Sequence, residues 1–201
     1  KGIEMHFLSN VQINRNVIKN GEFSFYMANC DNVDVTNNYL ESEGNLAVTT
    51  TVVSNVTFTN NFIESTGGKC LDLSWASNIQ LKNNTFKNPN GGFHNTYLDN
   101  IVDTLLLVNN IFDCGSTSSS YILRLNDIED DILIMDNNLF HENADRTLRI
   151  TGGYQHGGIG MGGNYDSLVH WVNSQSVFDQ NSRSESPIYL SNDNLHIEND
   201  T

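Results

Sequence analysis

The chain has 201 residues, a length that suits one domain, and a formal net charge of −14 from 24 acidic and 10 basic residues. This charge argues against a nucleic-acid partner, because phosphate backbones are bound by clustered Lys and Arg. No apolar run approaches the roughly 18 residues of a membrane-spanning helix, and no signal peptide opens the sequence. We therefore expect no nucleic-acid partner and no membrane span.

A short phrase recurs along the chain, first in a weak form at Val11 to Ile18 with Arg15-Asn16 at its centre. The full phrase places alternating apolar residues before a pair of asparagines. These pairs begin at Asn37, Asn60, Asn83, Asn109 and Asn137, so successive pairs lie 23, 23, 26 and 28 residues apart. A nearly fixed period of this size predicts a repeat architecture.

Each phrase predicts two strands and a bend. Apolar residues alternate with polar ones before the pair, as at Val33 and Val35, which is the period of a strand with one buried face. Asn tolerates the left-handed backbone region, so the pair suits a sharp bend, and a second short strand follows it. If the coils stack at roughly 4.8 Å, each Asn amide can donate to the Asn of the next coil. We expect a ladder.

A third strand precedes each phrase, marked by apolar pairs at Phe23/Phe25, Leu46/Val48, Leu71/Leu73, Thr96/Leu98, Leu123/Leu125 and Leu148/Ile150. Three short strands in about 23 residues predict an all-β parallel β-helix of seven to eight coils. A leucine-rich repeat would need a Leu consensus that is missing. A β-sandwich gives no reason for five Asn pairs in register.

The Asn-pair turn, the three strands and the period resemble the right-handed parallel β-helix of the pectate-lyase-like superfamily, over at least Asn10 to Phe140. The resemblance implies that the Asn ladder lies between the second and third strands of each coil. It also implies that a substrate groove runs along the first strand, which holds Leu46, Leu71, Leu98, Leu123 and Leu148.

We expect one β-helix domain over residues 1–201, with a glycine-rich insertion loop at 152–166. The chain opens on Lys1, and Asn194 to Asp200 resembles the start of another phrase, so we expect a piece of a longer protein that continues at one or both ends. Cys30, Cys70 and Cys114 fall at different places in their coils, which favours buried thiols over disulfides.

Aligning the first strands gives two outward columns. The first holds Ala47, Asp72, Tyr97, Arg124, Arg149 and, at its end, Tyr189. The second, three residues earlier in each coil, holds Gly44, Lys69, His94, Tyr121 and Arg146. The two columns gather 4 of the 10 basic residues on one face of an acidic chain.

This chemistry suits a uronic-acid polymer cleaved by β-elimination, which needs a cation for the carboxylate, a base for the proton at C5 and an acid for the leaving oxygen. We assign the catalytic roles to Lys69, His94, Arg124 and Arg149. Asp72, Tyr97, Tyr121, Arg146 and Tyr189 are the predicted substrate contacts, with Tyr97 or Tyr121 also a candidate acid. Arg suits carboxylates because its guanidinium binds them in a forked geometry.

Calcium, if used, would take oxygen ligands, and either Asp72 or the acidic run at Asp127, Glu129, Asp130 and Asp131 offers them. The alternative is a solvated turn. Likewise, the outward Arg, Asp and Tyr residues on neighbouring coils have an alternative interpretation as ordinary cross-strand pairs without a binding role.

Three classes of function stay open: a secreted polysaccharide lyase-like enzyme, a non-catalytic carbohydrate-binding or adhesin module, and a structural β-helix module of a larger surface protein. All three place the chain outside the cell or at its surface. An enzyme predicts that Lys69, His94, Arg124 and Arg149 converge, whereas a spacer predicts that they scatter or pair internally. The polysaccharide itself is left open.

Overall fold

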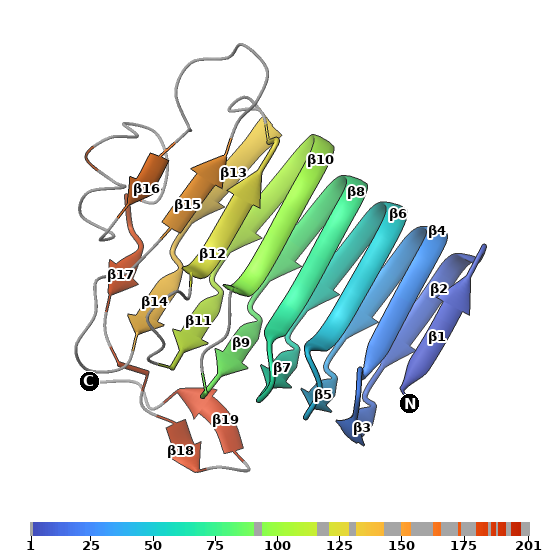
Figure 1. Cartoon of the computed structure of the whole chain (residues 1–201), viewed down its shortest axis with the longest axis horizontal. Coiled ribbons are helices and arrows are strands. Elements are labelled where there is room, and N and C mark those ends of the chain that lie inside the picture. Colours follow the sequence, from blue (N-terminus) through green and yellow to red (C-terminus); the bar gives the residue numbers. More distant parts are fainter. Residues whose placement is uncertain are drawn as a thin grey trace.

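The computed structural model shows a parallel β-solenoid, which confirms the predicted right-handed parallel β-helix (Figure 1). It describes residues 2–90, 94–115, 121–128, 132–142, 150–153, 163–165, 173, 180–184, 186–187, 189–191 and 194–197. About five turns stack in it, fewer than the seven to eight expected. Among the described residues no helix is long and apolar enough to cross a membrane.

The larger sheet holds the first and second strands of each coil. Its strands are β1 (Ile3–His6), β2 (Ser9–Asn14), β4 (Phe25–Thr36), β6 (Leu46–Thr59), β8 (Lys69–Lys82), β10 (His94–Val108), β12 (Tyr121–Asn126), β13 (Leu133–Asp136), β15 (Ile150–Gly153) and β16 (Gly163–Tyr165). All of them pair in parallel except β15 with β16.

The smaller sheet holds the third strand of each coil. Its strands are β3 (Val17–Gly21), β5 (Tyr39–Ser42), β7 (Phe62–Ser65), β9 (Thr85–Asn88), β11 (Ile111–Cys114), β14 (Leu139–Glu142) and β17 (Arg183–Ser184). In Figure 1 these short strands lie in a row beneath the long strands of the larger sheet. Each coil therefore pairs only with the coils before and after it.

The long strands β4, β6, β8 and β10 each contain two arms joined by a corner. In β8 the first arm is 69–74, the corner is 75–78 and the second arm is 79–82, and Trp75 and Asn78 have φ of 57° and 52°. Such left-handed residues turn the chain without ending the pairing with neighbouring coils. The two arms and the strand of the smaller sheet are the three predicted strands.

The two asparagines of each pair have different tasks. The first is left-handed, with φ between 54° and 56° at Asn37, Asn60, Asn83, Asn109 and Asn137. The second is buried, and the resulting ladder runs through Asn38, Asn61, Asn84, Asn110 and Asn138 with Nδ2 to Oδ1 distances of 3.0, 3.0, 3.1 and 3.1 Å. The predicted ladder is confirmed.

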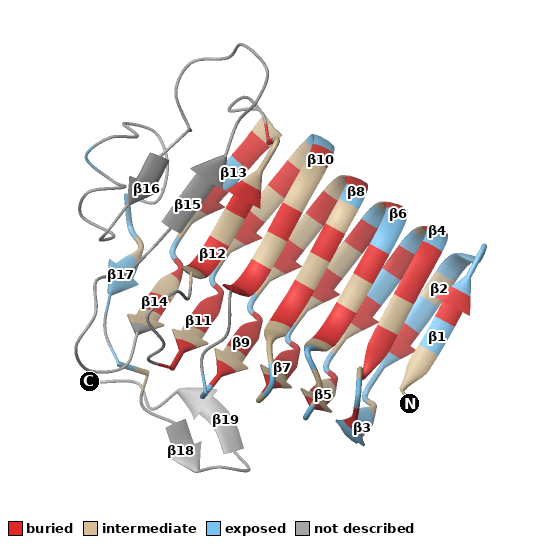
Figure 2. Cartoon of the chain, in the orientation of Figure 1, coloured by how far each residue is buried: buried red, intermediate tan, exposed pale blue. Residues whose placement is uncertain are grey.

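The interior is a continuous apolar column. The inward residues of the first arms are fully buried, among them Leu71, Leu98 and Leu123, and stripes of buried residues cross every coil in Figure 2. On the third strands the rings of Phe86, Phe112 and Phe140 stack at 5.2 and 5.1 Å. The three cysteines are buried and free, as predicted.

A hairpin lies near the C-terminus among the described residues. The phrase predicted at Asn194 to Asp200 contributes β19 (Asn194–Ile197), which pairs antiparallel with β18 (Tyr189–Ser191). The described strand of this phrase thus satisfies its backbone groups in a hairpin and not in a further coil. The predicted insertion at 152–166 starts within β15, and its residues 163–165 form β16.

Candidate functional site

The candidate site lies on the outward face of the first arms of β8, β10 and β12. The register places Asp72 beside Tyr97 and Tyr97 beside Arg124, while His94 lies beside Tyr121. Paired residues on neighbouring parallel strands are roughly 4.8 Å apart, so these side chains must contact one another. We call the group formed by Lys69, Asp72, His94, Tyr97, Tyr121 and Arg124 the Lys69–Arg124 cluster.

Lys69 contacts two members of the cluster. Its Nζ is 2.7 Å from Asp72 Oδ2 and 4.5 Å from the centre of the Tyr97 ring. The Asp72 carboxylate also accepts a hydrogen bond from Ser74 Oγ at 3.2 Å. Both charged side chains keep part of their surface exposed, 25% for Lys69 and 17% for Asp72. The ammonium is thus held in place over an aromatic face and remains open to solvent.

His94 is enclosed by the other members. Its ring stacks on Tyr97 at 5.5 Å and packs against Tyr121 at 5.2 Å. Nη1 of Arg124 is 3.2 Å from His94 Nε2, and the guanidinium carbon is 5.3 Å from the Tyr97 ring centre. One imidazole therefore lies between two phenol rings with a cation on its Nε2 edge.

Burial first, and then the charges of Arg124 and Lys69, lower the pKa of His94 from 6.5 to about 4. The imidazole is neutral at pH 7. Because an Arg can only donate, Nε2 accepts and the proton sits on Nδ1, which is buried and has no hydrogen-bond partner among the described residues. Burial, followed by the Asp99 carboxylate, raises the pKa of Tyr97, so its phenol keeps its proton.

Two register predictions need correction. Arg124 pairs with Thr151, two residues beyond the predicted Arg149, and Asp72 pairs with Thr49 in place of Ala47, which is fully buried. The first strands carry no Asn pair to fix their alignment, so a two-residue slip preserves the apolar pattern and passes unnoticed. Arg146 and Arg149 themselves lie outside the described residues.

Of the remaining predicted residues, the structure describes Asp127 and the backbone of Tyr189. Tyr189 belongs to the β18–β19 hairpin, not to the solenoid sheet, and its side chain is outside the described part of the chain. Of the acidic run, Glu129, Asp130 and Asp131 also lie outside it, and Asp127 is a left-handed corner residue with φ of 50°.

The described carboxylates do not make a calcium site. Asn126 links two of them, with its Nδ2 at 2.5 Å from Asp99 Oδ1 and 3.4 Å from Asp127 Oδ2. Calcium takes six to eight oxygen ligands, and no group of three His, Cys, Asp or Glu residues suited to a metal occurs in the described ranges. The predicted calcium ligands Glu129, Asp130 and Asp131 lie outside these ranges, so the calcium site remains a prediction.

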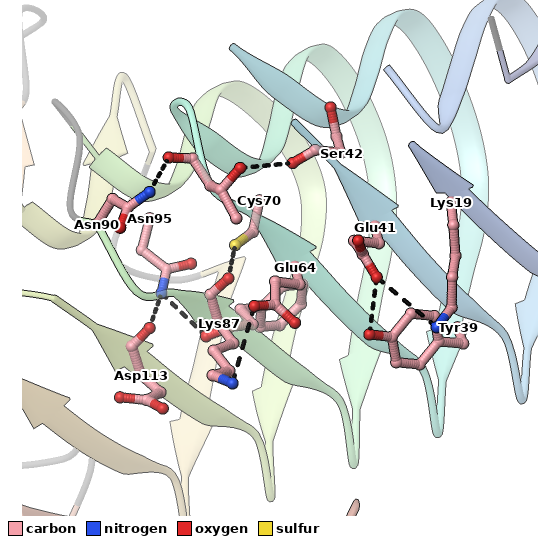
Figure 3. Close-up of polar contacts among 12 residues, drawn as sticks. Lys19, Tyr39, Glu41, Ser42, Glu64, Cys70, Lys87, Asn90, Asn95 and Asp113 are labelled. Atoms are coloured by element: carbon pink, nitrogen blue, oxygen red, sulfur yellow. Dashed lines mark hydrogen bonds and ion pairs between the residues drawn. The ribbon is translucent and has the colours of Figure 1, made fainter. Parts of the chain in front are cut away.

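A second charged column was missed by the sequence reading. It runs along the outward face of the smaller sheet through Lys19, Glu41, Glu64, Lys87 and Asp113 (Figure 3). The register continues the column from Asp113 to His141. Its contacts include Lys19 to Glu41 at 3.9 Å, Lys87 to Glu64 at 3.8 Å and His141 to Asp113 at 2.8 Å. Burial is the main cause that raises the pKa of Glu64. The members of this column contact one another along the strands, so we assign them to the scaffold.

A signal for this column was present in the sequence. Each member lies four residues after the first position of an Asn pair, or after Arg15 in the weak first phrase. Charged residues at one fixed offset from a repeated turn predict a ladder of charges on a single face of the third sheet.

Comparison with known families matches residues 1–112 to the right-handed β-helix region. The chain belongs to the right-handed β-helix family. The matched part contains most of the solenoid and includes Lys69, Asp72, His94 and Tyr97, whereas Tyr121 and Arg124 follow it. Neither the comparison with curated proteins nor that with solved structures gives a match. Membership in the β-helix family fixes the fold and leaves function to be argued from the site.

Proposed function

We propose that this β-helix protein binds a uronic-acid polysaccharide across the Lys69–Arg124 cluster and cleaves it there by β-elimination. One observation carries the proposal. Two cations, a neutral imidazole and two phenols from three successive coils contact one another on one outward face. These are the group types that elimination next to a carboxylate requires.

Each group has a role that its surroundings favour. Arg124 and Lys69 bind the carboxylate at C5 and stabilise the negative charge that develops on it, and Asp72 holds Lys69 in place. His94 accepts the C5 proton at Nε2, which is free of a proton at neutral pH. Tyr97 keeps its proton at that pH and donates it to the leaving oxygen, with Tyr121 as the alternative donor.

The step balances within these groups. The electron pair of the C5–H bond becomes the C4–C5 double bond, and the C4–O bond breaks. The leaving oxygen takes the proton of Tyr97, and the proton held by His94 returns to the tyrosinate directly or through water. The bound carboxylate offsets the charges of Arg124 and Lys69, which otherwise oppose protonation of His94. Substrate binding thus raises the basicity of the proposed base.

A second candidate is a binding module without catalysis. The contacts Lys69–Asp72 and Arg124–His94 already occupy both cations, and His94 is buried. Such pairing is compatible with binding a carboxylate at the surface while no group reaches C5. Either role requires an extracellular polymer, so we place the chain outside the cell or at a cell surface. The predicted contributions of Arg146, Arg149 and Tyr189 remain predictions.

The test is the ultraviolet absorbance of the new C4–C5 double bond during incubation with alginate, pectate or chondroitin, with and without added calcium. We expect one polymer to give a rise that falls ~100-fold in Arg124→Ala and Lys69→Ala. Lys19→Ala is the matched control, because Lys19 also lies 4.5 Å from a tyrosine ring and pairs with a carboxylate, but on the smaller sheet.

The outcomes separate the candidates. Binding without absorbance change, lost in Lys69→Ala and kept in Lys19→Ala, assigns the non-catalytic role. An absorbance rise that survives both Lys69→Ala and Arg124→Ala places the active site elsewhere. No binding to any of these polymers by folded protein overturns the proposal.

A further inference from the structure

The first corner position of each coil carries unexpected residues. All six are left-handed, with φ between 50° and 57°, and they are Phe7, Asn29, Val52, Trp75, Asn100 and Asp127. Asn and Asp tolerate the left-handed backbone region, whereas a β-branched or bulky residue is strained there. Val52 and Trp75 therefore oppose the local backbone preference of the corner.

These residues gain no burial in return. The exposed fractions are 51% for Val52, 62% for Trp75 and 78% for Phe7. In Figure 2 the bends at the far ends of the long strands carry exposed residues, in contrast with the buried stripes of the arms. A residue that is strained and exposed contributes to neither the turn nor the core, and such outliers point to a role outside folding.

The corner also encloses a trough of about 520 Å³ that crosses four coils. Its floor consists of the short buried side chains of Cys30, Val53 and Ala76, which pair in register. The trough follows the helix axis, and three coil spacings of roughly 4.8 Å make it about 14 Å long.

The two rims of the trough differ in chemistry. The first rim has Val52 and Trp75 at its centre, with an asparagine at each end, Asn29 and Asn100. The second rim consists of Asp31, Ser54, Ser77 and Val102. Asp31 is a fixed acceptor, because Ser54 Oγ donates to its Oδ1 at 2.5 Å and Asn55 Nδ2 at 2.8 Å. Two apolar side chains thus face two hydroxyls across a narrow floor, with one carboxylate at the end of the second rim.

This arrangement selects the kind of ligand. An extended peptide would seek free backbone groups, but the arms that flank the trough pair coil to coil. The trough lining contains no Lys or Arg and holds one carboxylate, which disfavours anionic lipid and uronate alike. A neutral sugar chain fits both walls, because its ring faces are apolar and its edges carry hydroxyls.

We propose that this corner trough binds uncharged hexose or pentose residues of a glycan, with Trp75 stacked on a sugar ring. The site is separate from the Lys69–Arg124 cluster and does not rest on the function proposed for it. Trp75 and Lys69 share strand β8, but Trp75 lies at its corner and Lys69 at its start. A polymer with neutral and acidic stretches would engage both.

The test is isothermal titration calorimetry with cello-, manno- and xylo-hexaose as separate probes. We expect at least one to bind, and Trp75→Ala to weaken it ~tenfold or more while Trp75→Phe retains most of the affinity. Lys69→Ala is the matched control, and we expect it to leave neutral-sugar binding unchanged. This result does not depend on whether the protein acts on uronates. Thermal melts check folding, and Trp75→Ala should melt no lower than the parent, because Trp75 is strained and exposed.

Three results would overturn the proposal. The first is that none of the hexaoses binds the folded parent protein. The second is that Trp75→Ala binds a hexaose as tightly as the parent does. The third is that sedimentation shows self-association that Trp75→Ala abolishes, which would mean that the trough binds a second copy of the chain.

Discussion

The Asn turn and the outward face of the first arms follow opposite rules. At the turn the same residue occupies every coil from Asn38 to Asn138, and each copy from Asn38 to Asn110 donates to the asparagine of the next coil. On the first arms the residue changes with each coil, from Thr49 to Asp72, Tyr97 and Arg124. Both sets belong to the same stack of coils.

The difference separates scaffold from site. A ladder works only if every coil supplies the same group, since each amide needs a donor on one side and an acceptor on the other. An outward position on a first arm has no such requirement, because the backbone pairing and the inward residues already hold the strand. Unlike residues there are free to form the Lys69–Arg124 cluster.

The largest effect is expected from breaking the ladder. Asn84→Ala removes four hydrogen bonds, two accepted from Asn61 and two donated to Phe58 O and Asn110 Oδ1. Because the partners are buried, we expect a loss of about 4 kcal/mol in the free energy of unfolding. The exposed Asn83→Ala, the matched control, should cost about 1 kcal/mol for its left-handed backbone. Equal losses in urea denaturation would remove the distinction between the two asparagines.

A smaller effect comes from His94 on the variable face. Its pKa of about 4 in the folded chain lies below the ordinary 6.5, so unfolding takes up a proton between these pH values. The stabilisation is complete above pH ~6.5 and is lost as the pH falls through ~4, for a total of about 3 kcal/mol.

His94→Asn should lack this contribution while it keeps all other titrating groups. Urea denaturation of both proteins at several pH values between 4 and 7 measures the difference. Parallel pH profiles of parent and variant would mean that the imidazole of His94 is not desolvated in the way described.

The smallest effect concerns a coil that departs from the repeat. Val52→Asn places a residue that tolerates φ of 55° where a β-branched one is strained and half-exposed. We expect the free energy of unfolding to rise by about 1 kcal/mol, measured by chemical denaturation. The same substitution should weaken neutral-sugar binding at the corner trough. A destabilised variant would show that Val52 contributes packing that its exposure conceals.

The repeating parts of the molecule were predictable. The alternation and the Asn pairs predict the strands, the bends and the ladder, because each requirement recurs at the same place in every coil. The cluster of Lys69, His94, Tyr97, Tyr121 and Arg124 also followed from aligning the apolar pairs of the first arms, although the repeat lengthens across these coils.

The prediction failed where the repeat gives no marker. Ala47 and Arg149 were misplaced because apolar alternation is unchanged by a two-residue slip. For the coil of Ala47, the 23-residue period of the Asn pairs would have given Thr49. The corner at Val52 and Trp75 was unpredictable for a different reason. Neither residue type signals a left-handed backbone, so only the structure locates it.

The most direct test of the cluster as a uronate site is calorimetric titration of matched variants with a uronic-acid oligomer. The oligomer is taken from whichever polymer binds the parent protein best. We predict that Arg124→Ala weakens binding ~30-fold or more and that Lys69→Ala has a similar effect, because both remove a cation beside the carboxylate. Lys19→Ala should bind like the parent protein. Equal affinity in all four proteins, or a loss shared by Lys19→Ala, would contradict the assignment of this face as the binding site.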